Sequence, residues 1–223
     1  MQKLFPDLGF LGEEGTAGSR PTGGRYFVVD PIDGTTNFIH GLPHYCISLA
    51  YKEQGRTVLG AVYVPYFDDF YHAMPGQGAC RNGERIRVSR TTTLINALGA
   101  TGFACVRQRV ANDNVPIFSR AIYELRGVRR LGSAAIDMCM VAEGKFDLYW
   151  EINIRPWDIA AGALLVQEAG GRVTDLDGGS AYEERDQVVG SNGLLHEAFL
   201  DLVRQVRATT RHWNRPTSNT FKV

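Results

Sequence analysis

The sequence predicts an α/β (α+β) fold built in layers, in which an antiparallel meander sheet is followed by a second, mixed sheet with its helices. Between residues 46 and 89, short runs of β-forming residues are separated by turns, which is typical of an antiparallel meander. In the second half of the chain, strand-like and helix-like segments alternate, which predicts a second sheet. With 223 residues, the chain is long enough to bury one substantial core or two closely joined lobes.

The first half of the chain is predicted to consist mainly of strands. A glycine-rich loop at 12–24 leads into residues 25–29, a short apolar run that predicts a buried strand with Asp30 at its carboxyl end. Gln54-Gly55 and Asn82-Gly83 have the composition of hairpin turns. The β-like segments of the predicted meander are residues 46–51, 57–64, 70–73 and 86–88.

Apolar spacing and helix signals predict the elements of the second half. Ser133 is a natural N-cap for the segment that follows it. Pro156 fits the first turn of a helix, and Gly170-Gly171 ends that helix. The predicted order is a helix at 115–125, a strand at 128–131, a helix at 133–144, a strand at 146–150 and a helix at 156–170.

Composition limits the class of protein. We expect one domain at 1–206, with lobes at about 1–98 and about 99–206, and a polar tail at 207–223. The formal net charge is zero and no dense run of Lys and Arg is present, so we expect no nucleic-acid partner.

No run approaches the roughly 20 apolar residues that span a bilayer, and no signal peptide is recognisable, so we expect a cytoplasmic protein with no membrane partner. The four cysteines are far apart in apolar surroundings, which predicts reduced, mostly buried thiols.

The strongest functional signal is the segment at 30–38, which starts with two carboxylates three residues apart. Pro31 keeps Asp30 out of the helical region, so the strand runs extended to its end and then turns toward Asp33. Across that turn the two carboxylates can converge, and the backbone carbonyl of Ile32 lies between them. Oxygen ligands with no nearby His or Cys select a hard cation, of which Mg²⁺ is the usual choice beside a phosphate.

The residues that follow predict a place for an anion. Gly34 allows a backbone to approach closely, and Thr35 and Thr36 can cap a helix whose free N–H groups would bind phosphate. The alternative for the segment is a polar strand-to-helix turn with no metal, for which Asp33 and Gly34 are common residues.

Two further carboxylate segments can join this site. Glu13 and Glu14 lie in the glycine-rich loop, and Asp158 lies in the first turn of a predicted helix. Adjacent glutamates in a loop are usually only solvated, and the helix dipole favours an acidic residue in the first turn whether or not it binds metal. Both alternatives stay open on the residues alone.

Taken together, these segments resemble the inositol monophosphatase family. They occur in the order and spacing of that family, and the resemblance extends over roughly residues 5–204. The matching segments are Gly12-Glu13-Glu14, residues 30–38, Gly41-Leu42-Pro43-His44, Gly76-Gln77-Gly78-Ala79, and Trp157-Asp158-Ile159-Ala160-Ala161-Gly162 followed by Glu168-Ala169-Gly170-Gly171.

The resemblance implies the layered sandwich of the sugar phosphatases and hydrolysis of a phosphate monoester with two or more Mg²⁺ ions. Glu13, Asp30 and the Ile32 carbonyl would bind one ion, and a second would be bound by Asp30, Asp33 and Asp158. One ion would lower the pKa of a water molecule while the other stabilises the departing alcohol oxygen.

The resemblance also assigns the remaining site residues. Glu13 and Thr35 would orient the attacking water, and the N–H groups of Gly34 and Thr35 would bind the phosphate. The alcohol part of the substrate would meet Gly132, Ser133, Ala134, Glu151 and Asp158. Independent reasoning agrees in part, because the loop at Ser133 should open on the same sheet edge as the metal site, and Glu151 follows a strand. A plain helix cap at Ser133 and a solvated Glu151 are the alternatives.

The chain departs from the family pattern at its start. Family members usually begin with two long helices that cover one face of the core, and these helices are missing before residue 5. A misplaced start, a fragment, or a shortened protein whose apolar face is covered by a partner would each explain this. For a chain complete as given, we expect weakened activity and reduced solubility.

The expected activity is hydrolysis of inositol monophosphate or a similar small polyol phosphate. Histidinol phosphate, fructose 1,6-bisphosphate and 3′-phosphoadenosine nucleotides are alternative substrates, because relatives with the same metal ligands act on them. A weakly active interaction protein is the alternative of another class. A homodimer and inhibition by Li⁺ are implied by the resemblance alone.

Overall fold

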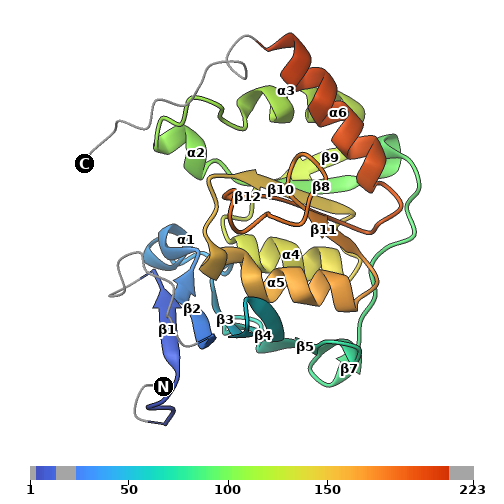
Figure 1. Cartoon of the computed structure of the whole chain (residues 1–223). Helices are drawn as coiled ribbons and strands as arrows, with labels where there is room; N and C mark the ends of the chain where they lie inside the picture. The colour runs from blue at the N-terminus through green and yellow to red at the C-terminus, as the bar shows by residue number, and fades with distance from the viewer. Residues whose placement is uncertain (1–3, 14–23, 211–223) are drawn as a thin grey trace.

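The described residues of the computed structural model, 4–13 and 24–210, form alternating layers of sheet and helix (Figure 1). A seven-stranded sheet, here called sheet A, and a five-stranded sheet, sheet B, enclose the two helices α4 (Ala134–Ala142) and α5 (Pro156–Glu168). The helices α2 (Ala104–Arg107), α3 (Val115–Glu124) and α6 (His196–Thr209) lie on the other side of sheet B. The predicted layered α/β fold is therefore confirmed.

Sheet A is the predicted meander, because its strands are adjacent in the order in which they occur in the chain. All neighbours pair antiparallel except β1, which runs parallel to β2. The strands are β1 (Gly9–Gly12), β2 (Arg25–Asp33), β3 (Cys46–Glu53), β4 (Arg56–Val64), β5 (Asp69–Met74), β6 (Gly78–Arg81) and β7 (Glu84–Arg85).

The predicted strand at 86–88 is wrong. The last strand of sheet A is instead β7, which ends at Arg85. The chain then leaves the sheet, because the N–H of Val88 donates to the carbonyl of Ala169 at the end of α5 rather than to a neighbouring strand. The strands β1 and β6, which the sequence did not predict, are short and contain glycine.

Strand β2 does not end at Asp30 but continues to Asp33 with a shift in register. Asp30 pairs with Ser48 and Asp33 with Cys46, so three steps along β2 match two along β3. Pro31, which lies in the irregular part, has no N–H to donate to a neighbouring strand. In a regular strand, residues three apart point to opposite faces of the sheet. The extra residue brings the side chains of Asp30 and Asp33 to the same face.

Sheet B is mixed, as predicted. Its strands are β8 (Leu98–Thr101), β9 (Gly127–Arg129), β10 (Leu148–Ile152), β11 (Arg172–Thr174) and β12 (Gln187–Ser191), in the spatial order β11-β12-β10-β8-β9. Strand β8 pairs parallel with β9 and β10, and β12 pairs antiparallel with β10 and β11. The strands predicted at 128–131 and 146–150 correspond to β9 and β10 with shifted ends.

Helices α4 and α5 are buried between the two sheets because small residues allow close contact. A Cβ at Gly162 of α5 would lie 2.7 Å from the Cβ of Met138 in α4. A Cβ at Gly60 of β4 would lie 2.9 Å from the carbonyl oxygen of Ala161.

Helices α3 and α6 cover the other face of sheet B, where α6 buries Phe199 and Val203. Helix α6 runs to Thr209 and so includes the first residues of the predicted tail; residues 211–223 lie outside the described residues.

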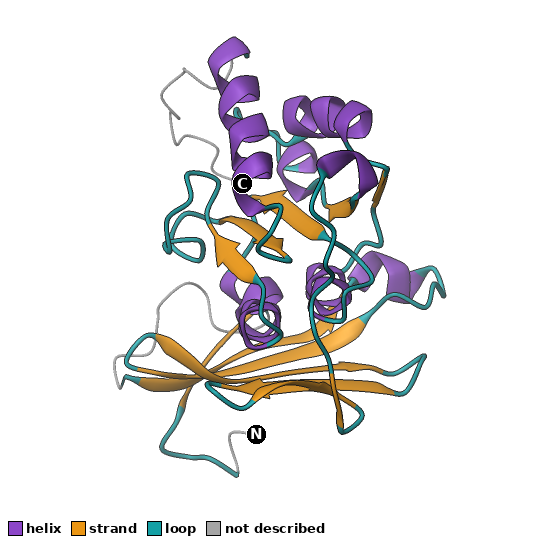
Figure 2. Cartoon of the chain, turned by 90° about the vertical axis from the view of Figure 1, so that its right-hand side faces the viewer, coloured by secondary structure: helices purple, strands orange, loops and turns teal. Residues whose placement is uncertain are grey.

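The two faces of sheet A differ. One face packs on α4 and α5, whereas among the described residues no helix lies on the other, as Figure 2 shows. The exposed fractions of Ile47, Phe70 and Met74 on this outer face are 43%, 44% and 42%. Antiparallel sheets usually carry polar residues on a solvated face. The outer face of sheet A is therefore unusually apolar.

The four cysteines form no disulfide, and three of them, Cys46, Cys105 and Cys139, are buried. None of the helices in the described part of the chain is long and apolar enough to cross a membrane.

Candidate active site

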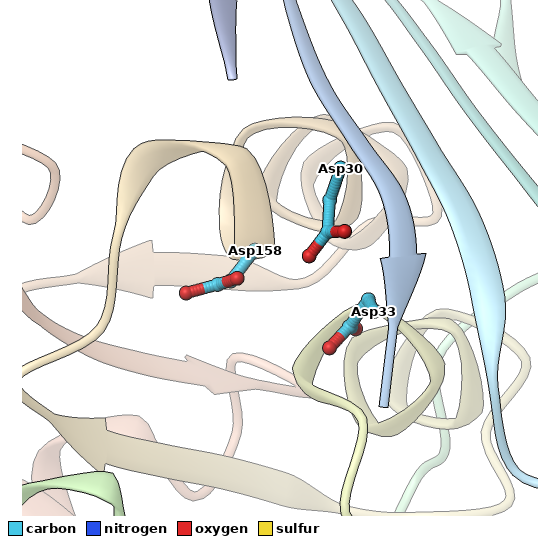
Figure 3. A group of neighbouring side chains, drawn as sticks. All are labelled: Asp30, Asp33 and Asp158. Carbon is cyan, nitrogen blue, oxygen red and sulfur yellow. The ribbon is translucent and has the colours of Figure 1, made fainter. Parts of the chain in front are cut away.

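Three carboxylates converge where β2 approaches α5. Asp30 and Asp33 come from β2, and Asp158 comes from the first turn of α5. One oxygen from each carboxylate lies within 4.8 Å of the others, and Figure 3 shows the three side chains around one space. The structure therefore brings together three residues that were predicted as metal ligands from segments far apart in the chain.

Each carboxylate of this triad is held in place by a second contact. The hydroxyl of Ser133 and the N–H of Ala135 donate to Oδ2 of Asp33 at 2.6 and 2.8 Å. The N–H of Ile32 donates to Oδ1 of Asp30 at 2.9 Å, and the N–H of Arg155 donates to Oδ2 of Asp158 at 2.9 Å. These bonds leave carboxylate oxygens free to face one another. Such fixed orientation is what a metal site requires.

The electrostatics of the triad favour a cation. Burial raises the pKa of Asp30 to about 7, and the neighbouring charge of Asp33 adds to the effect. Burial likewise raises the pKa of Asp33 and of Asp158 above the ordinary range. The cause is that carboxylates in low dielectric, close to one another, ionise reluctantly. An oxygen-only donor set of three carboxylates fits Mg²⁺, whose charge would relieve this cost.

The triad lines a pocket of about 510 Å³, here called the triad pocket. Glu13 and Ile32, the other predicted metal-binding residues, also line it, and the charge of Glu13 contributes to the raised pKa of Asp30. The carbonyl of Ile32 accepts a hydrogen bond from the Thr35 hydroxyl at 3.0 Å. Glu14 lies outside the described residues.

The turn into α1 (Thr35–Ile39) is made by glycine, and the predicted threonine cap is wrong. Gly34 is the N-cap residue with φ 89°, and no side chain caps the helix. The hydroxyl of Thr35 is used for the bond to Ile32 instead. A Cβ at Gly34 would lie 2.7 Å from the carbonyl oxygen of His44, so both the backbone angle and the space require glycine.

A second pocket of about 160 Å³, here called the Glu151 pocket, adjoins the first. The residues that line both pockets are Asp33, Ala104, Arg130, Gly132 and Asp158. Those that line only the Glu151 pocket are Thr101, Gly102, Ser133, Ala134, Asp137, Glu151 and Ile154. All the residues predicted for the alcohol part of the substrate therefore lie around this pocket.

The contacts of Ser133 and Glu151 distinguish between the alternatives that the sequence left open. Ser133 is indeed the N-cap of α4, since its hydroxyl oxygen accepts from the N–H of Ile136 at 3.2 Å, but it also donates to Asp33. Glu151 is not a solvated residue at a strand end. It lies within β10, is 6% exposed, and accepts a hydrogen bond from the hydroxyl of Tyr149.

The position of Glu151 explains two further features. A Cβ at Gly102 would lie 2.2 Å from both carboxylate oxygens of Glu151, so this glycine makes room for the carboxylate. Burial raises the pKa of Glu151 to about 7, although the bond from Tyr149 opposes the shift. The pocket thus contains a buried carboxylate poised between its charged and neutral forms at neutral pH.

Comparison with known proteins agrees with this geometry. The model of the inositol monophosphatase family matches residues 1–208. The chain belongs to the inositol monophosphatase family. Members of this family are metal-dependent phosphomonoesterases, and the triad is consistent with their use of divalent metals.

Relatives within the inositol monophosphatase family carry several names. The fructose-1,6-bisphosphatase/inositol-1-monophosphatase of Thermotoga maritima is 41% identical over 206 residues, which are 92% of this chain and 77% of that protein. The Nus factor SuhB of Pseudomonas aeruginosa is 40% identical over 208 residues, again 92% of this chain and 77% of the relative. An inositol monophosphatase structure from Anabaena has a TM-score of 0.87 at 36% identity and covers 92% of this chain and 81% of its own.

Two segments that carry the family resemblance have structural roles here. The carboxylate of Glu168 accepts hydrogen bonds from the N–H groups of Gly76 and Gly78 at 2.9 and 2.7 Å. The side-chain amide of Asn37 donates to the carbonyls of His44 and Leu131, which joins α1 to the loop before α4. Neither Glu168 nor Asn37 lines the triad pocket or the Glu151 pocket.

Gly102, Arg130 and Asp137 line the Glu151 pocket but were not predicted from the sequence as site residues. No motif marks Gly102, whose role depends on the distant Glu151. For Asp137 a signal existed, since a carboxylate stands between Ile136 and Met138 in an otherwise apolar helix. Charged residues are rarely fully buried unless they have partners.

Proposed function

We propose that the chain hydrolyses the phosphate monoester of a small polyol, with inositol monophosphate as the first choice and Mg²⁺ as the cofactor. The observation that carries the proposal is the joining of the two pockets at Asp33 and Asp158. One pocket offers converging carboxylates for metal ions that bind a phosphate. The adjoining pocket offers polar groups for the hydroxyls of the alcohol.

The chain's own residues at the phosphate end have distinct proposed roles. Glu13, Asp30 and the Ile32 carbonyl would hold one Mg²⁺, and Asp33 and Asp158 would join Asp30 in holding another. Bound Mg²⁺ would supply Lewis-acid stabilisation of the phosphate and of the departing alcohol oxygen. The N–H groups of Gly34 and Thr35 would bind the phosphate oxygens.

Thr35 is also suited to orient the attacking water together with Glu13. Its hydroxyl hydrogen is engaged by the Ile32 carbonyl, so the oxygen lone pairs are left to accept a hydrogen bond from water. The position of Thr35 depends on Gly34, because the positive φ and the close carbonyl of His44 at this turn require glycine. Catalysis would then depend on positioning and electrostatics rather than on a covalent intermediate.

At the other end, Gly132, Ser133, Ala134 and Glu151 would bind the polyol, with Asp158 shared between the two parts. Glu151 has a fixed orientation, because Tyr149 donates to one of its oxygens and the N–H of Ala104 lies 3.5 Å from the other. A carboxylate held in this way can accept hydrogen bonds from hydroxyl groups of the substrate.

Other family substrates and one other function compete with this proposal. Histidinol phosphate, fructose 1,6-bisphosphate and 3′-phosphoadenosine nucleotides would use the same triad. The name of the Pseudomonas aeruginosa relative favours an interaction protein as the second candidate. Support for an enzyme comes from the presence of every carboxylate expected to bind metal.

The test is phosphate release from the four substrates, with Mg²⁺ and with a chelator, for the parent and for Asp33→Asn. We expect release from inositol monophosphate that requires Mg²⁺, is inhibited by Li⁺ and falls on the order of 10³-fold in the variant. Gel filtration in the same buffer is expected to show a homodimer.

A matched control is Asp147→Asn, since Asp147 is also buried but accepts hydrogen bonds from Ser89 and Leu98 away from both pockets. Its activity should remain near that of the parent. A tenfold preference for histidinol phosphate would reject inositol monophosphate as the substrate. Activity that is absent in the parent, or equal in Asp33→Asn, would favour the interaction protein.

A further inference from the structure

Asp137 in the first turn of α4 is a buried carboxylate that lacks a hydrogen bond. It is 2% exposed, and its Oδ1 atom is buried with no hydrogen-bond partner among the described residues. Other buried carboxylates have partners: Asp33, Asp147, Glu151 and Asp175 all accept hydrogen bonds. A buried carboxylate without a hydrogen bond lowers the stability of the fold, so the presence of one at position 137 needs a reason other than stability.

The position on a helix does not supply that explanation. An acidic residue in a first turn interacts favourably with the helix dipole, but an exposed side chain gains this as well as a buried one. The N–H groups at the start of α4 are already used, by Ser133 and by Asp33. Asp137 is thus not needed to cap the helix.

The surroundings of Asp137 indicate a ligand instead. Its side chain lines the Glu151 pocket together with Glu151, Ser133 and Thr101. Burial raises the pKa of Asp137 well above its ordinary range; the charges of Glu151 on β10 and Asp33 on β2 add to the effect, and the charge of Arg130 in the loop before α4 opposes it. Carboxyl groups in such surroundings ionise reluctantly, so the pocket disfavours added negative charge and suits a neutral molecule that exchanges hydrogen bonds with the carboxyl group.

We propose that Asp137 is a specificity-determining residue that accepts a hydrogen bond from a hydroxyl of a neutral polyol bound beside Glu151. This inference rests on the proposed phosphatase function and names its substrate class. Two buried carboxyl groups on neighbouring elements can each accept a hydroxyl hydrogen from the same sugar-like ring. A second phosphate would lose its hydration beside these groups, so the site selects the monophosphate of a neutral polyol over a bisphosphate or a nucleotide.

The test compares two substrates in Asp137→Asn and Asp137→Ala. Inositol monophosphate carries hydroxyl groups, whereas 4-nitrophenyl phosphate has none. We expect the ratio of their kcat/KM values to fall about 3- to 10-fold in Asp137→Ala, mainly through a higher KM for inositol monophosphate, because the hydrogen-bond acceptor is lost. The ratio should change much less in Asp137→Asn, whose amide oxygen can still accept the hydroxyl hydrogen. The Mg²⁺ concentration required for half-maximal activity should stay at the parent value.

Thermal stability separates this role from a structural one. Asp137→Asn keeps both the side-chain shape and an acceptor oxygen, so we expect its Tm and its substrate ratio to stay near the parent values, whereas Asp137→Ala should lose polyol selectivity. Asp147→Asn, which breaks existing hydrogen bonds, is the matched control. Its Tm should fall and its substrate ratio should equal that of the parent.

The outcomes distinguish this inference from the proposed function. A parent that hydrolyses both substrates, with an unchanged ratio in Asp137→Ala, overturns the inference alone. Equal losses on both substrates, or a parent that prefers fructose 1,6-bisphosphate, also overturn it. A parent that releases phosphate from neither substrate with Mg²⁺ overturns the proposed function together with the inference.

Discussion

The triad pocket and the Glu151 pocket are built from the same residue type but are arranged for different chemistry. In the triad pocket, three carboxylates face one another within 4.8 Å, an arrangement that calls for a cation. In the Glu151 pocket, the carboxylate of Glu151 accepts a hydrogen bond from Tyr149 and is not part of that cluster. Buried carboxylates therefore acquire their function from the groups around them, not from their burial.

The largest effect is expected for Asp30→Asn, which changes the triad pocket. Asp30 is the residue proposed to hold both ions, so we expect phosphate release to fall on the order of 10³-fold with every substrate. Without metal, however, the variant should have a higher Tm than the parent, because one of three repelling carboxylates is gone. Mg²⁺ should raise the Tm of the parent but not that of the variant. If Mg²⁺ raises both equally, the triad is not the metal site.

A second test uses pH and addresses the Glu151 pocket alone. The pKa of Glu151 is about 7 in the folded protein, against an ordinary value of 4.5. As pH rises from 4.5 to 7, the unfolded chain loses this proton while the folded protein keeps it, so the free energy of unfolding falls with pH. In Glu151→Gln, which cannot ionise, we expect this fall in the free energy of unfolding to be smaller by about 3 kcal/mol.

The measurement is urea unfolding of the parent and Glu151→Gln at pH 4.5 and pH 8, in chelator and in Mg²⁺. Since Asp30, Asp33 and Asp137 are present in both proteins, the difference between them reports on Glu151. Mg²⁺ should stabilise both proteins at pH 8 and leave that difference unchanged. Equal pH dependence in the two proteins would show that Glu151 is ionised when buried.

The smallest effect is expected for Gly162→Ala, which should change both pockets together. Helix α5 carries Asp158, and α4 carries Asp137 and the N–H of Ala135 that binds Asp33. Gly162→Ala would place a Cβ 2.7 Å from that of Met138 and push the helices apart, at a cost of about 1–2 kcal/mol in the free energy of unfolding.

Because both helices move, the selectivity between inositol monophosphate and 4-nitrophenyl phosphate should stay near the parent value in Gly162→Ala, while the rates on both fall. The second substitution Met138→Gly removes that Cβ, so the double variant should lose less stability than the sum of the single variants. Simple additivity would mean that this contact does not set the helix spacing.

The parts of the fold and site that the sequence predicted depend on local chemistry. The meander follows from the hairpin turns at Gln54-Gly55 and Asn82-Gly83, and the cap at Ser133 needs only the backbone three residues on. Asp30, Asp33 and Asp158 could be grouped because their motifs resemble a family in which they act together.

The parts that could not be predicted depend on contacts between distant segments. Strand β8, with the sequence Leu-Gly-Ala-Thr, has too few β-branched residues to be recognised, and its Gly99 is explained only by the nearby Leu125 and Trp150 side chains. The burial of Glu151 and the unpaired oxygen of Asp137 likewise arise from packing. The threonine cap failed because Gly34, with its positive φ, takes the N-cap position.

The register shift in β2 sets a constraint on insertions and deletions. The carboxylates of Asp30 and Asp33 share a face only because three steps along β2 match two along β3. Loss of one residue between them would restore the regular pairing, but it would also shorten the turn that brings Asp33 to Ser133 and Ala135. The length of this segment therefore matters to the site as much as the identity of its side chains does.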